Sequence, residues 1–236
     1  MLSKTDKRID NLQKTIKYYF KKIDLLYTAL SHPSYAHENN LPHYKSNQRL
    51  EFLGDAVLGL TVSEIIYNEY PNFPEGRMTK VRANVVCEST LARIARDVLL
   101  GEFLYLGKGE EATGGRKRTS ILADALEALI GAIYIDGGIE QAKQFVKNYF
   151  YNEIKDTIQK QNYKDYKSTL QELTQRDNKE KLYYEVIGES GPDHDKIFTV
   201  HVKFHNKILG KGKGKSKKEA EQAAAKSALK DLDIPL

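Results

Sequence analysis

The chain has 236 residues, of which 37 are basic and 32 acidic, with a net charge of +5 and 40% apolar residues, so we expect a globular chain with one large domain or a large and a small one. No apolar run approaches the roughly 18 residues of a membrane span, and the charged N-terminal segment lacks the apolar core of a secretory signal. Because a single cysteine, Cys87, excludes an intrachain disulfide and a cysteine-built zinc site, we expect a cytoplasmic protein with no membrane partner.

Helical patterns fill the first two thirds of the chain. Residues 9–20 have apolar side chains at steps of three and four, which predicts an amphipathic helix. Residues 49–67 are apolar on nearly all sides, which predicts a helix buried on most of its surface. Further helices are predicted at residues 79–100, 120–134 and 139–158, and the glycine-rich charged segment 107–118 is expected to be a loop. Because no segment here has a convincing strand pattern, we expect an all-α domain at residues 1–155.

A polar segment, residues 156–165, is predicted to link this domain to a C-terminal part with a different pattern. Phe198, Val200 and Val202 alternate with polar residues, which predicts a half-buried strand. Flanking strands are predicted at residues 182–187 and 207–209, and helices at residues 167–176 and from Ser216 onward. The order α-β-β-β-α predicts a small α+β domain at residues 166–236, with both helices on one face of a three-stranded sheet.

Lysines concentrate just before the last helix. Six of them, with no acidic residue between, lie within 12 residues: Lys207, Lys211, Lys213, Lys215, Lys217 and Lys218. Such a window typically faces a polyanion, because neutralised phosphates release their counterions, although a solvated lysine loop explains the charge equally well. The glycine–lysine run at residues 210–215 lacks the spacing of a phosphate-binding loop. It is expected to be a turn entering the helix, where Ser216 and Glu219 form a capping box.

Two pairs of carboxylates interrupt the two most apolar predicted helices. Glu51 and Asp55 lie four residues apart, and Asp124 and Glu127 three apart, so each pair shares one helix face. Solvated acidic stripes are the ordinary explanation, but the flanking residues are apolar and no lysine or arginine lies four residues beyond any of the four. Burying unpaired carboxylates costs several kcal/mol unless a cation holds them. If the two helices face each other, the pattern predicts a site for Mg²⁺ or Mn²⁺ and hence phosphodiester or phosphoryl chemistry.

Other catalytic arrangements have little support in the sequence. No serine or cysteine nucleophile motif is present. His32, His37 and His43 are spaced five and six apart in a predicted loop, and we do not expect them to bind a metal.

Residues 48–56, QRLEFLGDA, resemble the motif of the ribonuclease III family over nine consecutive positions. The resemblance extends to residues 29–35, 75–79 and 120–128. Further along the chain, short segments resemble a double-stranded RNA-binding domain: residues 170–172, 191–194 and 215–221. One nuclease domain followed by one RNA-binding domain is the order of the bacterial enzymes, whereas Dicer carries two nuclease domains in one chain.

The resemblance implies a homodimeric, Mg²⁺-dependent endoribonuclease in which each protomer cuts one strand of an RNA duplex. The products would have 5′-phosphate and 3′-hydroxyl ends and short 3′ overhangs, and the cellular role would be the processing of ribosomal and messenger RNA precursors. By position, Glu51, Asp124 and Glu127 correspond to direct metal ligands, and Asp55 to a residue that orients or activates the attacking water. Gln48 stands where the family often has an acidic residue, which puts an accessory contact in doubt; Glu75 matches the second accessory acid.

In the C-terminal domain the resemblance points to three groups of RNA contacts. They are Ser168, Gln171, Glu172 and Gln175 on the first helix, His194 in the following turn region, and Lys217 and Lys218 at the start of the last helix. The helix residues would bind 2′-hydroxyls and minor-groove edges, His194 would enter the next minor groove, and the lysines would grip phosphates. Without the resemblance, a solvated helix face explains Gln171 and Gln175.

Two other functions are compatible with parts of this pattern. The first is a non-catalytic RNA-binding protein in which the nuclease fold serves only as a dimer scaffold, but such a protein has no need of four costly carboxylates. The second is a metal-dependent phosphohydrolase for small molecules, which has no need of an RNA-binding domain.

Overall fold

The computed structural model describes residues 7–162, 166–175, 182–192, 196–205 and 207–231. The chain divides into two compact units, residues 1–157 and 158–236, which we call the helical unit and the sheet unit. No helix in these ranges is long and apolar enough to cross a membrane.

The helical unit contains helices of very different length. They are α1 (Lys7–Ile16), α2 (Ile23–Leu30), α3 (Pro33–Glu38), α4 (Gln48–Glu69), α5 (Glu75–Val85), α6 (Glu88–Asp97), α7 (Lys108–Ala112), α8 (Thr119–Gly137) and α9 (Ile139–Asn162). Three 3₁₀ turns, η1 (His43–Lys45), η2 (Leu100–Phe103) and η3 (Gly115–Lys117), complete it. Within the described part of the unit, extended pairing is limited to one isolated bridge between Ser31 and Tyr105. The prediction of an all-α domain is therefore confirmed.

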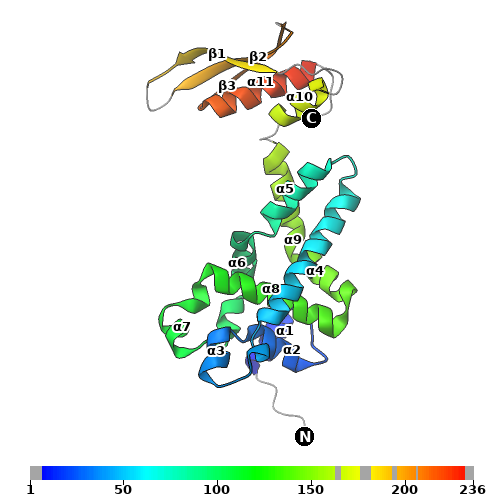
Figure 1. Ribbon diagram of the computed structural model, residues 1–236, viewed down its shortest axis with the longest axis vertical. Coiled ribbons are helices and arrows are strands. Elements are labelled where there is room, and N and C mark those ends of the chain that lie inside the picture. Colours follow the sequence, from blue (N-terminus) through cyan, green and yellow to red (C-terminus); the bar gives the residue numbers. More distant parts are fainter. Residues whose placement is uncertain (1–6, 163–165, 176–181, 193–195, 206, 232–236) are drawn as a thin grey trace. The chain divides into compact units, whose positions relative to one another are not determined.

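Helix α8 forms the centre of the helical unit, with α2, α4 and α6 packed around it (Figure 1). Most of its apolar residues are buried, among them Leu122, Leu126 and Ile130, whereas Ile135 near its end is exposed. Helix α4 crosses it with the two backbones in contact. A Cβ atom on Gly54 would lie 1.8 Å from the carbonyl oxygen of Glu127, so only glycine permits this crossing.

Three predictions in the helical unit were wrong in detail. The helix predicted at residues 9–20 ends at Ile16, where the backbone of Lys17 turns to φ 55°. The helix predicted at residues 79–100 is two helices, α5 and α6, because Cys87 is extended, with φ −75° and ψ 152°. The apolar periodicity continues across this turn and therefore hides it. The loop predicted at residues 107–118 contains α7 and η3; its glycines, such as Gly114 with φ 79°, form the turns between these short helices.

The sheet unit has the predicted order of elements. Helix α10 (Tyr166–Gln175) precedes strands β1 (Tyr183–Ser190), β2 (Ile197–Phe204) and β3 (Lys207–Gly214), and α11 (Lys217–Asp231) follows. The sheet is antiparallel in the order β1-β2-β3, and both helices cover one face (Figure 1). Its core consists of Leu170, Val200, Val202, Ala220, Ala224, Ala225, Ala228 and Leu229. The predicted α+β class is confirmed.

Strand β3 is longer than expected, because the glycine–lysine run predicted to be a turn is part of it. Gly210 and Gly212 are buried, whereas Lys211 and Lys213 are exposed, so the run follows the period of two of a strand. A Cβ atom on Gly212 would lie 2.1 Å from the amide nitrogen of Ala224. The glycines thus let α11 pack directly on the strand, although glycine usually disfavours strands.

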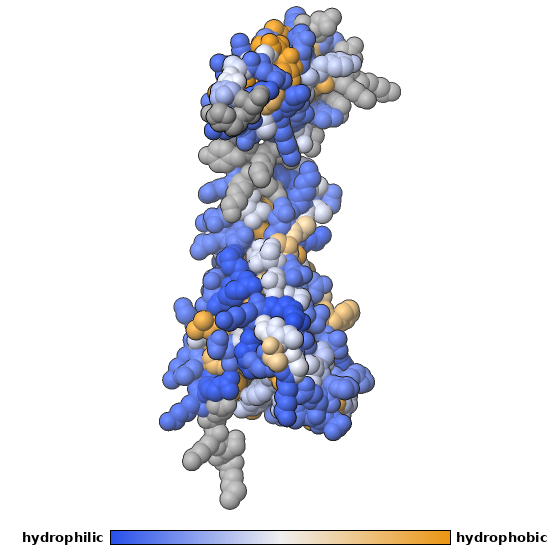
Figure 2. Space-filling model, turned by 90° about the vertical axis from the view of Figure 1, so that its left-hand side faces the viewer, coloured by the Kyte–Doolittle hydropathy of each residue, from blue (hydrophilic) through white to orange (hydrophobic). Residues whose placement is uncertain are grey.

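The outer face of the sheet carries apolar as well as charged groups. In the view of Figure 2, hydrophobic side chains gather on the sheet unit, while the helical unit is largely hydrophilic. The exposed large apolar residues of the sheet unit are Tyr183, Val186, Ile187, Ile197 and Ile208. Between them, Lys203 forms a 2.5 Å ion pair with Glu185.

Candidate functional site

The crossing of α4 and α8 brings three predicted carboxylates together. Glu51, Asp124 and Glu127 each offer one oxygen atom, and these oxygens all lie within 4.8 Å of one another. All three side chains are partly buried. The contact of Gly54 with the carbonyl of Glu127 places the turn of α8 that carries these acids against the first turns of α4.

Asp55 lies at the edge of this group. Its residue is exposed, and it is not one of the three whose oxygens lie within 4.8 Å. Its charge nevertheless contributes to raising the pKa of both Glu51 and Glu127. The structure therefore gathers three of the four predicted acids, and Asp55 is exposed one turn further along α4.

The pKa values of the three clustered acids reflect burial and mutual repulsion. Burial, followed by the charges of Asp55, Glu51 and Asp124, raises the pKa of Glu127 to about 8. Burial also raises the pKa of Glu51 and that of Asp124, and the charge of Glu88 raises the pKa of Asp124 further. Within the described ranges, no lysine or arginine forms an ion pair with any of these three acids. A divalent cation among them would remove the repulsion, and an all-oxygen donor set fits a hard cation.

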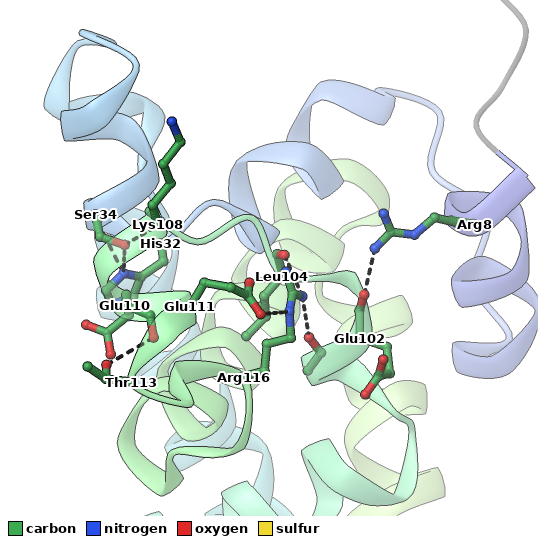
Figure 3. Close-up of polar contacts among 12 residues, drawn as sticks. Arg8, His32, Ser34, Glu102, Leu104, Lys108, Glu110, Glu111, Thr113 and Arg116 are labelled. Carbon is green, nitrogen blue, oxygen red and sulfur yellow. Dashed lines mark hydrogen bonds and ion pairs between the residues drawn. The ribbon is translucent and has the colours of Figure 1, made fainter.

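The segment that leads into α8 is held by ion pairs that sequence reasoning missed. Arg118 contacts Glu110 at 2.5 Å, and Arg116 contacts Glu111 at 2.6 Å. Arg116 also donates hydrogen bonds of 2.9 Å to the carbonyls of Gly101 and Leu104 (Figure 3). These contacts fix the start of α8 and hence the position of its two acids. The two glutamates and the three basic residues that follow them in the segment were a signal, but the pairing depends on the tertiary fold.

The two accessory positions lie at helix starts. Gln48 is the first residue of α4 and is exposed. Glu75 is the first residue of α5 and accepts a 2.8 Å hydrogen bond from the Thr79 hydroxyl. Neither belongs to the group of three acids.

The predicted RNA contacts of α10 are only partly described. Gln171 is exposed and Ser168 is partly buried. Glu172 and Gln175 belong to the same helix, but their side chains lie outside the described part of the structure, and so does the whole of His194.

The two predicted lysine contacts open α11. Lys217 and Lys218 are its first residues and are exposed, and the Lys217 ammonium lies 5.8 Å from the centre of the Phe198 ring. Ser216 caps the helix, because its hydroxyl accepts a 3.2 Å hydrogen bond from the amide of Glu219. The Glu219 carboxylate accepts from the amide of Lys215, at 2.9 Å, and not from that of Ser216 as the capping box predicted. The cap holds both lysines on the first turn.

One face of α4 is apolar and exposed in the described part of the helical unit. Phe52, Leu60 and Tyr67 are 81%, 58% and 70% exposed. Their spacing of eight and seven residues places them on the same side of the helix. The prediction that α4 is buried on most sides therefore fails on this stripe, because the apolar pattern does not say whether the covering surface comes from the same chain.

Comparison with known proteins identifies both units. Residues 22–154 match the model of ribonuclease-III-like domains, and residues 166–232 that of the double-stranded RNA-binding motif. Ribonuclease 3 of Desulforamulus reducens is 48% identical over 98% of this chain and 94% of its own length. Ribonuclease 3 of Syntrophomonas wolfei is 53% identical over 90% of each chain.

A solved structure agrees with these matches. The nuclease domain of ribonuclease III from Campylobacter jejuni is 40% identical, with a TM-score of 0.55, over 60% of this chain and 98% of that one. The all-helical unit with its acidic group, and the sheet unit that follows it, have the same order as the two matched domains. The chain therefore belongs to the ribonuclease III family of double-stranded-RNA endoribonucleases.

Proposed function

We propose that this endoribonuclease hydrolyses the phosphodiester bonds of double-stranded RNA with Mg²⁺, or with Mn²⁺ in its place. The products would carry 5′-phosphate and 3′-hydroxyl ends with short 3′ overhangs. The observation that carries the proposal is the group of three acids at the α4–α8 crossing, whose oxygens all lie within 4.8 Å of one another. We propose the cytoplasm as the compartment and ribosomal and messenger RNA precursors as substrates.

The acids divide into two roles. Glu51, Asp124 and Glu127 would hold the metal, since their oxygens converge. Asp55, which is exposed, would orient or activate the attacking water. When bound, Mg²⁺ offsets the charge of the reacting phosphate and promotes ionisation of the water. No side chain attacks the phosphorus, so the reaction is a direct hydrolysis without a covalent intermediate.

The sheet unit would supply most of the affinity for the duplex. RNA duplexes hide their base edges in a deep major groove, so proteins bind them through phosphates and 2′-hydroxyls. Lys217 and Lys218 at the start of α11 suit the phosphates. Ser168, Gln171, Glu172 and Gln175 of α10, together with His194, are the proposed minor-groove contacts.

We place the nuclease domain at residues 1–155 and the RNA-binding domain at residues 166–236, joined by residues 156–165. The two family matches, 22–154 and 166–232, support these limits. Helix α9 continues to Asn162, so most of the connecting segment is helical.

We propose that the enzyme is a homodimer formed through the exposed stripe of α4. Phe52, Leu60 and Tyr67 would be covered by the same stripe of a second copy, since an isologous contact pairs one patch with itself. The Campylobacter jejuni structure is described as showing flexibility in a region involved in dimer formation of its nuclease domain. A dimer has two acidic groups, one for each strand of the duplex.

The experiment that tests the catalytic proposal compares wild type with Glu127→Gln on a long RNA duplex, with Mg²⁺ and with a chelator. Gln keeps the shape and removes the charge, so we expect the loss of cleavage with duplex binding nearly unchanged. Glu140→Gln, an exposed residue of α9, is the matched control and should cut normally. If Glu127→Gln cuts at the wild-type rate, the metal assignment is wrong.

The same assay addresses the non-catalytic alternative. Binding of the duplex without cleavage by the wild type under any divalent metal would favour a scaffold role.

A chain that ends at Asp165 tests the sheet unit, and it should bind the duplex more weakly, most visibly at physiological salt. Phe52→Asp tests the dimer, and sedimentation should then show a monomer.

A further inference from the structure

Part of the lysine window has no role in the duplex contacts proposed above. Lys217 and Lys218 open α11, whereas Lys211 and Lys213 belong to β3 and are exposed. In the described part of the chain, neither Lys211 nor Lys213 forms an ion pair. Strand β3 therefore presents two positive charges, two residues apart, to solvent.

Both lysines point away from the helices. A Cβ atom on Gly210 or Gly212 would lie 2.4 or 2.1 Å from backbone atoms of Ala224 in α11, so these glycines face the helix. Successive side chains of a strand alternate between the two faces of a sheet. Lys211 and Lys213 thus lie on the outer face, which α10 and α11 leave uncovered (Figure 1).

The same face carries exposed aromatic and aliphatic side chains. Tyr183 of β1 and Ile208 of β3 are 69% and 55% exposed. They form one row across the sheet, because each is the register partner of Lys203 in β2. In the next row of this face, His201 of β2 lies directly opposite Lys211. Rings and positive charges therefore lie side by side on the outer face.

The charge of the outer face favours a polyanion over a second protein. Its acidic residue Glu185 is already neutralised by the ion pair with Lys203, so Lys211 and Lys213 give the face a net positive charge. The cores of protein–protein interfaces are depleted in lysine. Lysines that neutralise phosphates, in contrast, gain binding free energy because the nucleic acid releases its counterions.

The exposed ring of Tyr183 distinguishes between the two forms of RNA. In a duplex the bases are stacked on one another, and proteins bind mainly phosphates and 2′-hydroxyls. The bases of a single strand are free to stack on the side chains of tyrosine and histidine, whatever their sequence. A face with both lysines and an exposed tyrosine therefore suits a single strand better than a duplex.

We propose that the outer face of the sheet unit binds a single-stranded RNA segment that extends from the duplex. Lys211 and Lys213 bind its phosphates, and Tyr183 stacks on one of its bases. The duplex contacts proposed for α10 and α11 come from the helices on the other face, so one RNA can occupy both surfaces. The inference rests on the proposed function only in taking RNA as the substrate.

The experiment measures binding of the full-length protein to three labelled RNAs in a chelator, which prevents metal-dependent cutting. The RNAs are a blunt duplex, the same duplex with a 3′ extension of about 10 uridines, and this oligouridine alone. We expect the extension to strengthen binding by the wild type about tenfold, as one stacked base does. The slope of log affinity against log salt should be steeper by about 1.4, because two more phosphates of a single strand are neutralised.

The variants divide this gain between charge and stacking. Lys211→Gln combined with Lys213→Gln should abolish the difference in salt slope. Tyr183→Ala should remove most of the gain in affinity, whereas Tyr183→Phe keeps the ring and should stay within about twofold of wild type. Lys147→Gln combined with Lys155→Gln removes the same charge from exposed positions of α9 and is the matched control. All of these variants should bind the blunt duplex as wild type does.

Three results would overturn the inference. They are equal affinity of the wild type for the blunt and the extended duplex, an undiminished gain in the Lys211 and Lys213 variant, and a change of oligomeric state in Tyr183→Ala. The last result would make the outer face an interface between copies of the chain. The blunt duplex tests the proposed function separately. If the wild type binds the oligouridine through Tyr183 but does not bind the blunt duplex, the proposed duplex contacts are wrong and the inference stands.

Discussion

The two units use glycine in the same way to bring a helix against its neighbour. In the helical unit, Gly54 of α4 and Gly131 of α8 remove the side chains between two helices, and a Cβ atom on Gly131 would lie 2.3 Å from the carbonyl oxygen of Leu50. In the sheet unit, Gly212 of β3 lets α11 approach until a Cβ atom would lie 2.1 Å from the amide of Ala224. Both contacts are backbone against backbone.

The difference lies in what each contact positions. The α4–α8 contact lies within one turn of Glu51 and Glu127, so a change in the helix separation also changes the spacing of the acids. The β3–α11 contact lies about two turns from Lys217 and Lys218, on the inner face of the sheet. A change in helix packing should therefore also change the metal site in the helical unit, whereas in the sheet unit it should leave the position of the lysines unchanged.

The largest effect is expected from Gly54→Ala. The added Cβ meets the backbone of α8, which has no flexible atom to move aside, so the helices must separate at a cost of about 3 kcal/mol. We expect a lower free energy of unfolding in urea together with the loss of Mn²⁺ binding and cleavage.

Gly59→Ala is the matched control in the same helix, because a Cβ atom there meets nothing within 4 Å. It should leave stability unchanged or raise it by up to about 1 kcal/mol, since alanine is the better helix former. A Gly54→Ala protein that keeps both wild-type stability and metal affinity would show that the crossing does not position the acids.

A smaller and separable effect is expected from Gly212→Ala. The Cβ would force α11 away from β3, at a cost of about 2 kcal/mol to the sheet unit. Duplex binding at physiological salt should weaken, while the Mn²⁺ affinity of the helical unit should not change. Gly188→Ala, where a Cβ meets nothing within 4 Å, is the control. A loss of metal affinity in Gly212→Ala would contradict the separation of the two units.

The acidic group could be predicted from the sequence because its carboxylates lie among apolar residues. Carboxylates such as Glu51 and Glu127 stand out inside apolar helices, and their spacing places them on one face. The class of each unit also followed from periodicity alone. Both features depend only on the spacing of residues within one segment, so they can be recognised from the sequence alone.

The features that sequence reasoning missed depend on surfaces from elsewhere in the fold. The glycines of β3 looked like a turn because their packing against α11 is not visible in the sequence. The stripe of Phe52, Leu60 and Tyr67 looked like core because periodicity does not tell which chain covers it. The hydrogen bond from the Gly107 amide to the Ser34 hydroxyl joins segments about 70 residues apart, so the predicted loop gave no sign of it.

Asp136 contrasts with the clustered acids, since hydrogen bonds stabilise its charge. Its carboxylate accepts from the Tyr18 hydroxyl and from the amides of Lys21 and Lys22, at 2.8, 2.9 and 2.8 Å. Burial alone would raise the pKa of Asp136, but these contacts lower it. The folded pKa lies below the unfolded value, so this stabilisation is complete above the unfolded pKa of about 3.9 and is lost as the pH falls through the folded pKa.

Asp136→Asn should therefore lower the free energy of unfolding at pH 7 by about 1 kcal/mol. Urea titrations at several pH values should show the gap to wild type narrowing below about pH 4. Asp156→Asn, exposed on α9, is the control. A gap that stays constant from pH 7 to pH 3 would mean that the charge of Asp136 is not what the three donors stabilise.

The smallest effect, and the one that best separates binding from stability, is expected from Lys218→Ala. A cation in the first turn of α11 opposes the helix dipole, so its removal should raise the stability of the sheet unit by about 0.3–1 kcal/mol. Because the lysine is proposed to bind a phosphate, the same change should weaken duplex binding and reduce the slope of log affinity against log salt by nearly 1.

Lys230→Ala, in the last turn of the same helix, should change the stability of the sheet unit in the opposite direction. A cation there favours the dipole, so its loss should lower stability slightly and leave the salt slope unchanged. Thermal unfolding and duplex titrations at three salt concentrations measure both quantities on the same proteins. Equal salt slopes for the two variants would remove Lys218 from the phosphate contacts. Higher stability together with weaker duplex binding in Lys218→Ala would show that Lys218 serves RNA binding and destabilises the helix.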